Sequence, residues 1–250
     1  MRPEAFDKKN LKGLLRHIQS VNLEGDEMME PKEAEVVLKV IKERRSIRKY
    51  KPDPVPDELI LKCLEAARWA PTGEDAQPWR FIIVKDPETR RKIGEIARRG
   101  SGRRFSVELY TGKMIERLGA HAWPEEKRRR VFEKLASGKV SAFLAEAPVN
   151  IVVCADKNTW DPREDCSAAI QNMLLMAKAL GLGTCWVIAP CTDVRDEMRM
   201  KELLNIPEEY KIVSVVALGY PDEAPRPRPR KELEEVVFYE RFGQKKGGAS

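Results

Sequence analysis

The sequence contains very little histidine. His17 and His121 are the only two among 250 residues. This scarcity excludes a histidine-rich metal site and argues against a Ser-His-Asp triad. Five cysteines are present, but no two have the C-x-x-C spacing of many redox and zinc sites, and most lie in apolar runs. We therefore expect reduced thiols, no metal site and a cytoplasmic protein.

Two glycine-rich nucleotide motifs are also missing. A Rossmann site needs G-x-G-x-x-G between a strand and a helix, and both "GSGRRF" and "GLGTCW" lack the third glycine. The segment "TGKMI" lacks the upstream glycine and the hydroxyl of a phosphate-binding P-loop. No apolar run reaches the roughly 18–20 residues of a membrane span, and the first ten residues are too polar for a signal peptide. The sequence thus predicts neither a membrane protein nor either kind of nucleotide site.

Charge, in contrast, is plentiful. Charged residues make up 34% of the chain, and 46 Lys and Arg against 40 Asp and Glu give a net charge of +6. A basic balance suits anionic partners such as phosphate esters. Nucleic acid is not an expected partner, because charged helices usually form an ordinary solvated surface. The length allows one large domain whose core needs no disulfide bonds.

Hydrophobic patterning predicts a mixture of helices and strands. Strands are expected at 81–84, 149–155, 184–189 and 211–219. Helices are expected at 4–22, 31–43, 57–69, 88–99 and 161–181. The last three strands are continuous apolar runs, which is typical of strands covered on both faces. Asp161, Pro162 and Glu164 have the spacing of a capping box at the start of the last helix. Residues 100–140 are basic and lack a clear strand, and we interpret them as an inserted helical lid.

Polar residues gather in four segments where loops are expected to meet a ligand. The segment "RRSIRKY" (44–50) follows a predicted helix, and "PTGEDAQPW" (71–79) leads into the strand at 81–84. The exit of the strand at 184–189 and the tail segment "RPRPR" (226–230) complete the set.

In this order the segments resemble the nitroreductase-like FMN-dependent oxidoreductase family. The resemblance runs from about Glu35 to Val237 and depends on an ordered set of motifs: "RRSIRKY", "AARWAPTGEDAQPWRFIIV", "AEAPVNIVV", "AIQNMLLMAKALGLGTCWV" and "ALGYPDEAPRPRPRKELEEVV". It implies an α+β fold in a homodimer, with a mostly antiparallel sheet of four or five strands wrapped by helices. We expect an FMN-binding domain at 35–243, an N-terminal helical extension at 1–34 and a flexible tail at 244–250.

The resemblance also implies a binding site for the FMN phosphate. Arg44 and Ser46 match the family's phosphate-side arginine and hydroxyl, and Arg45 lies between them. Arg228 and Arg230 match the family's K/R-x-R near the C-terminus. Arginine suits this role because its planar fork binds phosphate oxygens bidentately.

The loop at 71–79 implies contacts with the flavin ring. In the family it reads A-P-S-G-x-N-x-Q-P-W; here Pro71 and Gln77 match, and Thr72 replaces a serine. Asp75 stands where the family usually has Asn, and an ionised Asp only accepts hydrogen bonds. It can accept from the flavin N3–H, pair with Arg48, or cap its own loop. Arg48 matches a basic residue near the N1 and C2 edge of the flavin, where a cation stabilises the reduced ring.

The exit of the strand at 184–189 implies a backbone contact with flavin N5. Ile188 and Ala189 match this position, at which the side chain matters little. Phe105, Tyr110 and Trp123 lie in the 100–140 segment, and we expect them to stack on a planar substrate. Each of the three also fits an ordinary core aromatic.

These matches lead to a functional prediction. We expect an FMN-dependent oxidoreductase that takes hydride from NADH or NADPH and reduces an electron-poor small molecule, such as a nitroarene or quinone, by a ping-pong mechanism. No side chain is assigned as a catalytic acid or base, because the resemblance requires none. One alternative is another chemistry of the family: flavin fragmentation, reductive dehalogenation or ring dehydrogenation. The other is a non-catalytic basic binding protein, which would bind nucleic acid with a steep salt dependence.

Overall fold

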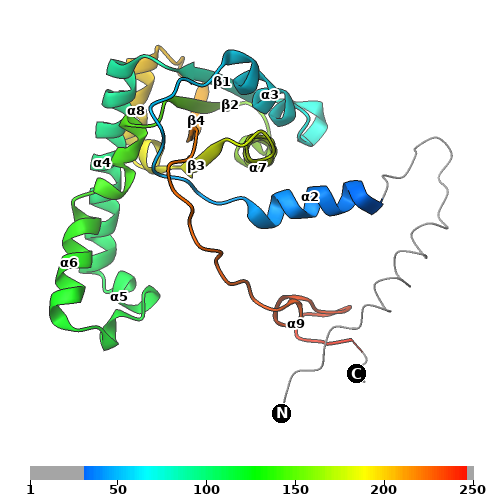
Figure 1. Cartoon of the computed structure of the whole chain (residues 1–250). Helices are drawn as coiled ribbons and strands as arrows, with labels where there is room; N and C mark the ends of the chain where they lie inside the picture. The colour runs from blue at the N-terminus through cyan, green and yellow to red at the C-terminus, as the bar shows by residue number, and fades with distance from the viewer. Residues whose placement is uncertain (1–30, 247–250) are drawn as a thin grey trace.

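The structure, a computed structural model, describes residues 31–246 (Figure 1). The predicted helix at 4–22 and the end of the predicted tail therefore lie outside the described residues. Four strands form one sheet in the order β1-β2-β4-β3, and every strand pair in it is antiparallel. They are β1 (Trp79–Val84), β2 (Val149–Asp156), β3 (Gly183–Val187) and β4 (Tyr210–Gly219). The predicted α+β fold with a mostly antiparallel sheet is confirmed.

Helices cover both faces of the sheet, as Figure 1 shows. On one face lie α3 (Asp57–Arg68) and α7 (Pro162–Ala179), and on the other α4 (Pro87–Tyr110) and α8 (Val194–Leu204). Side chains of β2 alternate between the two cores: Ile151 packs toward α3 and α7, and Val152 packs toward α4. This alternation follows from the period of two residues in a strand. It explains why the central strands β2 and β4 are apolar throughout.

Several elements match their predicted bounds closely. The helix α2 (Pro31–Glu43) has the predicted range, and α3, α7, β2 and β4 begin and end within two residues of it. The capping box at the start of α7 is wrong, because the side chain of Asp161 caps no backbone N–H of the helix. The strand β3 ends at Val187, so Ile188 and Ala189 belong to the following turn, η4 (Ala189–Cys191).

Helix α4 ends eleven residues after the predicted helix at 88–99, because its glycines do not break it. At Gly100 an added Cβ would lie only 2.3 Å from the carbonyl oxygen of Ala189. At Gly102 it would lie 2.8 Å from the carbonyl oxygen of Ala136. The glycines thus allow close contact between α4 and the turn after β3, and between α4 and α6 (Glu125–Ala136).

The 100–140 segment is helical. After the end of α4 it contains α5 (Lys113–Arg117), η2 (Ala120–Ala122) and α6, and η3 (Lys139–Ala145) then leads into β2. Helix α8, which the sequence reasoning missed, begins at an N-cap: the carboxylate of Asp193 accepts a hydrogen bond from the backbone N–H of Arg195. No helix within residues 31–246 is long and apolar enough to cross a membrane.

All five cysteines are free and buried, which confirms the expectation of reduced thiols. Burial raises the pKa of the Cys63 thiol to about 11 and that of Cys166 to about 12. Since the thiolate is the reactive form, these side chains act as small apolar groups in the core.

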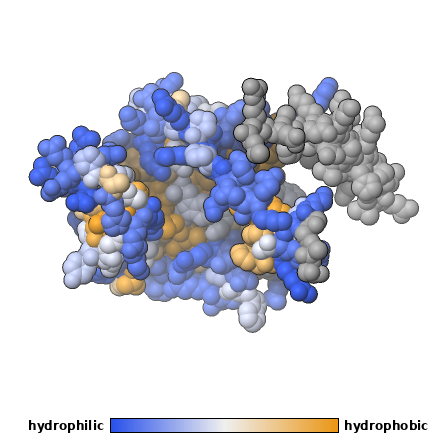
Figure 2. Space-filling model, turned by 90° about the horizontal axis from the view of Figure 1, so that it is seen from below, coloured by the Kyte–Doolittle hydropathy of each residue, from blue (hydrophilic) through white to orange (hydrophobic). Residues whose placement is uncertain are grey.

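Two segments extend away from this body (Figure 1). One is α2, and the other is the arm, which we define as residues 221–246 and which contains α9 (Leu233–Val236). Both expose large apolar side chains: Val36, Val37, Leu38 and Ile41 on α2, and Leu233, Val236, Val237, Tyr239 and Phe242 on the arm. Figure 2, which views the molecule from below, shows apolar patches between hydrophilic ones on this side. Surfaces of this kind usually bind another protein surface.

The contact at Gly100 yields a prediction. In a helix interior Gly→Ala normally stabilises a protein by about 0.5–1 kcal/mol. We expect Gly100→Ala to destabilise this one by about 1–3 kcal/mol, because the new methyl group meets the carbonyl oxygen of Ala189. Urea unfolding measures the change. Ser106→Ala, at an exposed position of the same helix, is the control and should stay within about 0.5 kcal/mol. Equal or greater stability of Gly100→Ala would contradict the close contact.

Candidate functional site

The segment 44–51 lies along β3 and the end of β4. Ser46 bridges Thr184 of β3, and the backbone N–H of Ile47 donates to the carbonyl of Thr184 at 2.9 Å. The backbone N–H of Lys51 donates to the carbonyl of Tyr220 at 2.9 Å. These contacts hold the polar segment after α2 against the base of the arm.

The six-arginine pocket is formed where this segment meets the arm. It has a volume of about 190 Å³ and is lined by Ser46, Pro225 and six arginines: Arg44, Arg45, Arg48, Arg226, Arg228 and Arg230. No carboxylate lines it, and within residues 31–246 none of the six guanidinium groups takes part in an ion pair. Like charges this close repel one another, so the pocket favours an anion.

Fixed contacts position the backbone of this pocket. The carboxylate of Glu223 accepts hydrogen bonds from the backbone N–H groups of Arg48 (2.5 Å) and Lys49 (3.2 Å). Arg45 Nη1 donates to the carbonyl oxygens of Lys42 (2.6 Å) and Arg44 (2.8 Å), at the end of α2. The Nε atom of Arg45 is buried and has no hydrogen-bond partner among the described residues. A buried donor without a partner is costly, and an anion in the pocket would provide an acceptor.

Arg48 lies beside the arginines that were predicted to bind the phosphate. It was expected at the flavin ring, apart from the phosphate, yet it lines the same pocket as the other five arginines. Arg226 is an addition to the predicted set. The alternation of Pro and Arg over 226–230 carries this signal, since alternate residues of an extended chain point to the same side.

The loop at 71–77 is anchored to the first turn of α7. The side chain of Asp165 is buried and accepts hydrogen bonds from the Thr72 hydroxyl (3.0 Å) and the Gly73 N–H (3.3 Å). The Thr72 oxygen in turn accepts from the backbone N–H of Gln77 at 3.0 Å. Asp165 was not predicted as part of this loop, because the two are far apart in the sequence.

The same loop contains strained backbone. Glu74, Asp75 and Gln77 have φ angles of 52°, 53° and 43°, in the left-handed region that costs a non-glycine residue roughly 1–2 kcal/mol. Such residues persist only where the surrounding contacts fix them, and they cluster at ligand sites. The exposed carboxylate of Asp75 accepts from the Gln77 side-chain amide at 2.8 Å. Of the three predicted roles of Asp75, capping its own loop is present, and no ion pair with Arg48 is found among the described residues.

The turn after β3 is held by its own hydrogen bonds. The carbonyl of Ile188 accepts from the N–H of Cys191 (3.0 Å) and from the Thr192 hydroxyl (2.8 Å). The side chain of Ile188 is 44% exposed, and Ala189 packs under α4 at Gly100. This turn lies about 13 Å from Thr184 along β3, at roughly 3.3 Å per residue.

One chain does not bring these three parts together. Lys178, near the six-arginine pocket at the end of α7, lies about 20 Å along the helix from Asp165, which holds the loop. The loop and the turn after β3 lie at the same end of the sheet, but β1 and β3 are its outer strands. Three strand spacings separate them by about 14 Å.

The three predicted substrate aromatics are scattered over the helical segment. Phe105 is half-buried on α4, and Tyr110 at the end of that helix is 94% exposed. The ring of Trp123 has the Lys127 Nζ atom 4.5 Å from its centroid. No ring contact joins any two of the three among the described residues. A shared stacking site remains a prediction.

The profile of the Nitroreductase family matches residues 41–220. The chain belongs to this family. It is 36% identical over 199 residues to a protein of Methanothermobacter thermautotrophicus, provisionally named an NADH dehydrogenase or NAD(P)H nitroreductase; the match covers 77% of this chain and 81% of that one. It is 31% identical over 202 residues to the iodotyrosine deiodinase of Thermotoga neapolitana, covering 80% of this chain and 96% of that one.

Solved structures of the nitroreductase family share the fold. An FMN-dependent nitroreductase from Clostridium difficile matches with a TM-score of 0.61 at 27% identity, over 82% of this chain and 99% of that one. The matched relatives differ in the activities in their names, so family membership by itself does not fix the reaction.

The anchor of the loop yields a prediction. Thr72→Val keeps the shape of the side chain but removes the hydroxyl's hydrogen bonds with Asp165 and Gln77 and leaves a buried Asp165 oxygen without its donor. We expect a loss of about 1–3 kcal/mol in the free energy of unfolding. Thr72→Ser retains the hydroxyl and is the matched control. If the valine and serine variants have equal stability in thermal unfolding, the hydroxyl does not hold the loop.

Proposed function

We propose that this nitroreductase-family protein is an FMN-dependent NAD(P)H oxidoreductase that reduces electron-poor acceptors such as nitroarenes or quinones. The observation that carries this proposal is the six-arginine pocket, which we assign to the FMN phosphate. A phosphate group is doubly charged or nearly so and has several acceptor oxygens, which is what a group of unpaired guanidinium donors requires.

The residues present fit FMN in three respects. The pocket is small, with a volume of about 190 Å³, and it holds six cations and no carboxylate. The buried Arg45 Nε lacks an acceptor. A strip of about 13 Å along β3, by the rise of a strand, joins the pocket to the turn at Ile188 and Ala189, and this length suits a mononucleotide. We therefore place the phosphate at the pocket and the ring toward the turn.

In this arrangement the chain's own residues bind and orient the cofactor. Arg44, Ser46, Arg228 and Arg230 hold the phosphate, and Arg48 supplies positive charge between the phosphate and the ring. When bound, FMN supplies hydride transfer between NADH or NADPH and the acceptor. Preorganised cations and backbone N–H groups stabilise the negative charge that such chemistry generates. No side-chain acid or base is assigned.

We further propose a homodimer in which each site is built from two chains. The loop at Thr72 lies too far from its own six-arginine pocket to share one small ligand with it, whereas a partner's loop can approach that pocket. The apolar side chains of α2 and the arm are exposed in the single chain and need a surface to cover them. Helix α7, by comparison, buries most of its apolar residues within its own chain and exposes Met176.

For the domain boundaries we keep those predicted from the sequence. We place the FMN-binding domain at 35–243 and treat the helical segment 100–140 as a lid beside the turn after β3. Residues 1–34 and 244–250 are assigned as an N-terminal extension and a tail.

A second candidate function is reductive dehalogenation of an aromatic ring. The match to the Thermotoga neapolitana deiodinase, which spans 96% of that protein, favours it. Turnover of 3-iodotyrosine by the reduced protein, with slow turnover of nitroarenes, would support this reading over the first.

The proposed cofactor yields a prediction about colour and affinity. The purified protein should be yellow and release FMN, and its absorbance should bleach with NADH or NADPH without oxygen and return with a nitroarene or quinone. We expect Arg228→Gln to raise the Kd for FMN about 10- to 100-fold, since a charge-assisted hydrogen bond contributes roughly 1.5–3 kcal/mol.

Lys231→Gln is the matched control, because this cation lies on the same arm but does not line the pocket. The Kd of Lys231→Gln for FMN should match that of the unaltered protein. A colourless protein that fails to bind added FMN would refute the proposal. If both variants raise the Kd for FMN equally, the phosphate does not bind in the six-arginine pocket.

The proposed dimer yields another prediction. Leu38→Glu places a charge among the exposed apolar residues of α2 and should convert a dimer of 28.6-kDa chains into monomers, with loss of FMN. Sedimentation velocity measures the mass. Lys39→Glu changes the charge of the neighbouring position by more and should leave the dimer intact. A monomeric unaltered protein with one FMN bound per chain would rule out the shared site.

A further inference from the structure

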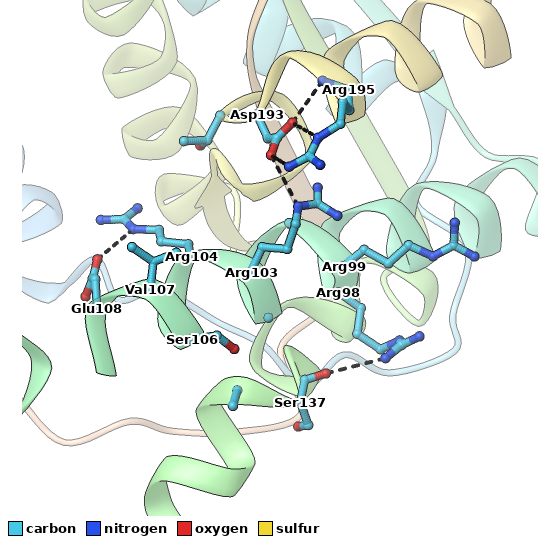
Figure 3. A pocket seen from close by; sticks show the side chains of 14 residues that line it. Arg98, Arg99, Arg103, Arg104, Ser106, Val107, Glu108, Ser137, Asp193 and Arg195 are labelled. Atoms are coloured by element: carbon cyan, nitrogen blue, oxygen red, sulfur yellow. Dashed lines mark hydrogen bonds and ion pairs between the residues drawn. The ribbon is translucent and has the colours of Figure 1, made fainter. Parts of the chain in front are cut away.

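A second, larger pocket lies on the side of the sheet that α4 and α8 cover. Figure 3 shows the side chains that line it. This α4 pocket has a volume of about 830 Å³ and lies between α4, the end of α6 and the start of α8. Its charged lining residues are five arginines and two acids: Arg98, Arg99, Arg103, Arg104, Arg195, Glu108 and Asp193. The volume is in the range of small-molecule sites, which is roughly 300–1,000 Å³.

Acidic side chains neutralise only some of these arginines. Asp193 lies between two of them, with Arg195 Nη2 at 2.7 Å and Arg103 Nε at 3.2 Å (Figure 3). Arg103 also pairs with the buried Asp196 of α8. Arg104 is paired with Glu108 at 3.0 Å.

Arg98 and Arg99 have no such partner. Neither takes part in an ion pair within residues 31–246, and Arg98 has only a 3.5 Å hydrogen bond to the carbonyl of Ser137. Five cations against two anions give the lining a net charge of +3. The pocket therefore attracts anions and keeps two guanidinium groups available for them.

The acidic residues hold the rest of the pocket in place. Asp193 caps α8, and hydrogen bonds from Arg195 lower the pKa of its carboxyl well below the ordinary value. It stays ionised at neutral pH and fixes the positions of Arg103 and Arg195. Such a preorganised frame reduces the entropy that a ligand loses on binding.

The α4 pocket lies next to the turn after β3. Thr192, which lines it, donates its hydroxyl hydrogen bond to the carbonyl of Ile188. Gly100, also a lining residue, packs directly on Ala189. The pocket thus adjoins the residues that the proposed function places at the reactive part of the cofactor.

We propose that the α4 pocket binds the oxyanion group of a substrate, a phosphate or a carboxylate, and that Arg98 and Arg99 determine this specificity. The inference rests on the proposed function and narrows its substrate class. A neutral nitroarene gains nothing from two unpaired guanidinium groups, whereas an oxyanion accepts paired hydrogen bonds from each. The group has two possible sources: the 2′-phosphate that distinguishes NADPH from NADH, or an acid group on the electron acceptor.

The test compares the FMN-saturated protein with a double variant, Arg98→Gln and Arg99→Gln, by isothermal calorimetry. Saturation with FMN fills the six-arginine pocket, so the probes report on the second one. One pair of probes is 2′,5′-ADP and 5′-AMP, which differ by the 2′-phosphate. The other pair is 4-nitrobenzoate and 4-nitrobenzamide, which differ by the charge.

We expect the double variant to bind one anionic probe about 10- to 100-fold more weakly and to bind the neutral or singly phosphorylated analogue within about twofold of the unaltered protein. Loss confined to 2′,5′-ADP assigns the pocket to NADPH, and the ratio of kcat/KM for NADPH to that for NADH should fall by a similar factor. If the double variant loses affinity only for 4-nitrobenzoate, the α4 pocket binds the acid group of an electron acceptor.

Arg91→Gln is the matched control, on the exposed side of α4 and outside the pocket, where Arg91 pairs with Glu88 and Glu95. It should leave all four affinities unchanged. Unchanged affinities in the double variant, or equal losses in the Arg91 variant, would overturn the proposal. Because both altered side chains are exposed, thermal unfolding should show the double variant to be folded.

The result is separable from the proposed function. If the protein takes up no FMN, the same titrations are made on the protein as purified, together with Arg44→Gln. Binding lost in the Arg98 and Arg99 double variant but kept in Arg44→Gln supports an oxyanion site without a flavoenzyme. Binding lost only in Arg44→Gln places the anion in the six-arginine pocket and refutes this inference.

Discussion

Hydrophobic contacts on both faces of the four-stranded sheet determine where polar groups can lie in this protein. The residues of β2 and β4 are buried almost throughout, and they pack against α3 and α7 on one side and α4 and α8 on the other. A charged side chain within these strands would lose its hydration without compensation. The predicted ligand-binding groups are therefore confined to the edge beside β3, to the turn at its end, and to the loop before β1.

The two arginine groups at this periphery differ in how far the protein neutralises them. In the six-arginine pocket no carboxylate is present, so the cations repel one another. An anion that binds there relieves this repulsion. In the α4 pocket Asp193 and Glu108 neutralise part of the charge and fix the geometry, which leaves a weaker but more ordered field. The first arrangement suits a resident phosphate and the second a ligand that must also leave.

Sequence reasoning was most successful where local chemistry decides the structure. The continuous apolar runs of β2 and β4 and the full range of α2 were predictable from pattern alone. It was wrong where contacts between residues that are far apart in the sequence determine the structure. The predicted helix ended at 99, but Gly100 and Gly102 lie inside α4, where they allow close contact with the turn at Ala189 and the end of α6. The capping box at Asp161 had the right spacing but does not form.

Only part of the candidate site was predictable from the sequence. The arginines at 44–48 and 228–230 were named from motifs, and the structure brings them together around one pocket. The support of the loop by Asp165 and the pocket around Arg98 and Arg99 were not predicted, because each depends on segments that are far apart in the sequence. Assignment of the named residues to FMN remains a prediction.

The arm has a consequence for the order of biosynthesis. It follows β4, so it is synthesised after every strand of the sheet. The body can fold while the arm is still emerging, and in the proposed dimer the apolar residues of the arm are covered only afterwards, when two folded bodies meet. Folding and assembly thus become successive steps. In the proposed dimer, the apolar residues of the arm are exposed to water only until two chains meet.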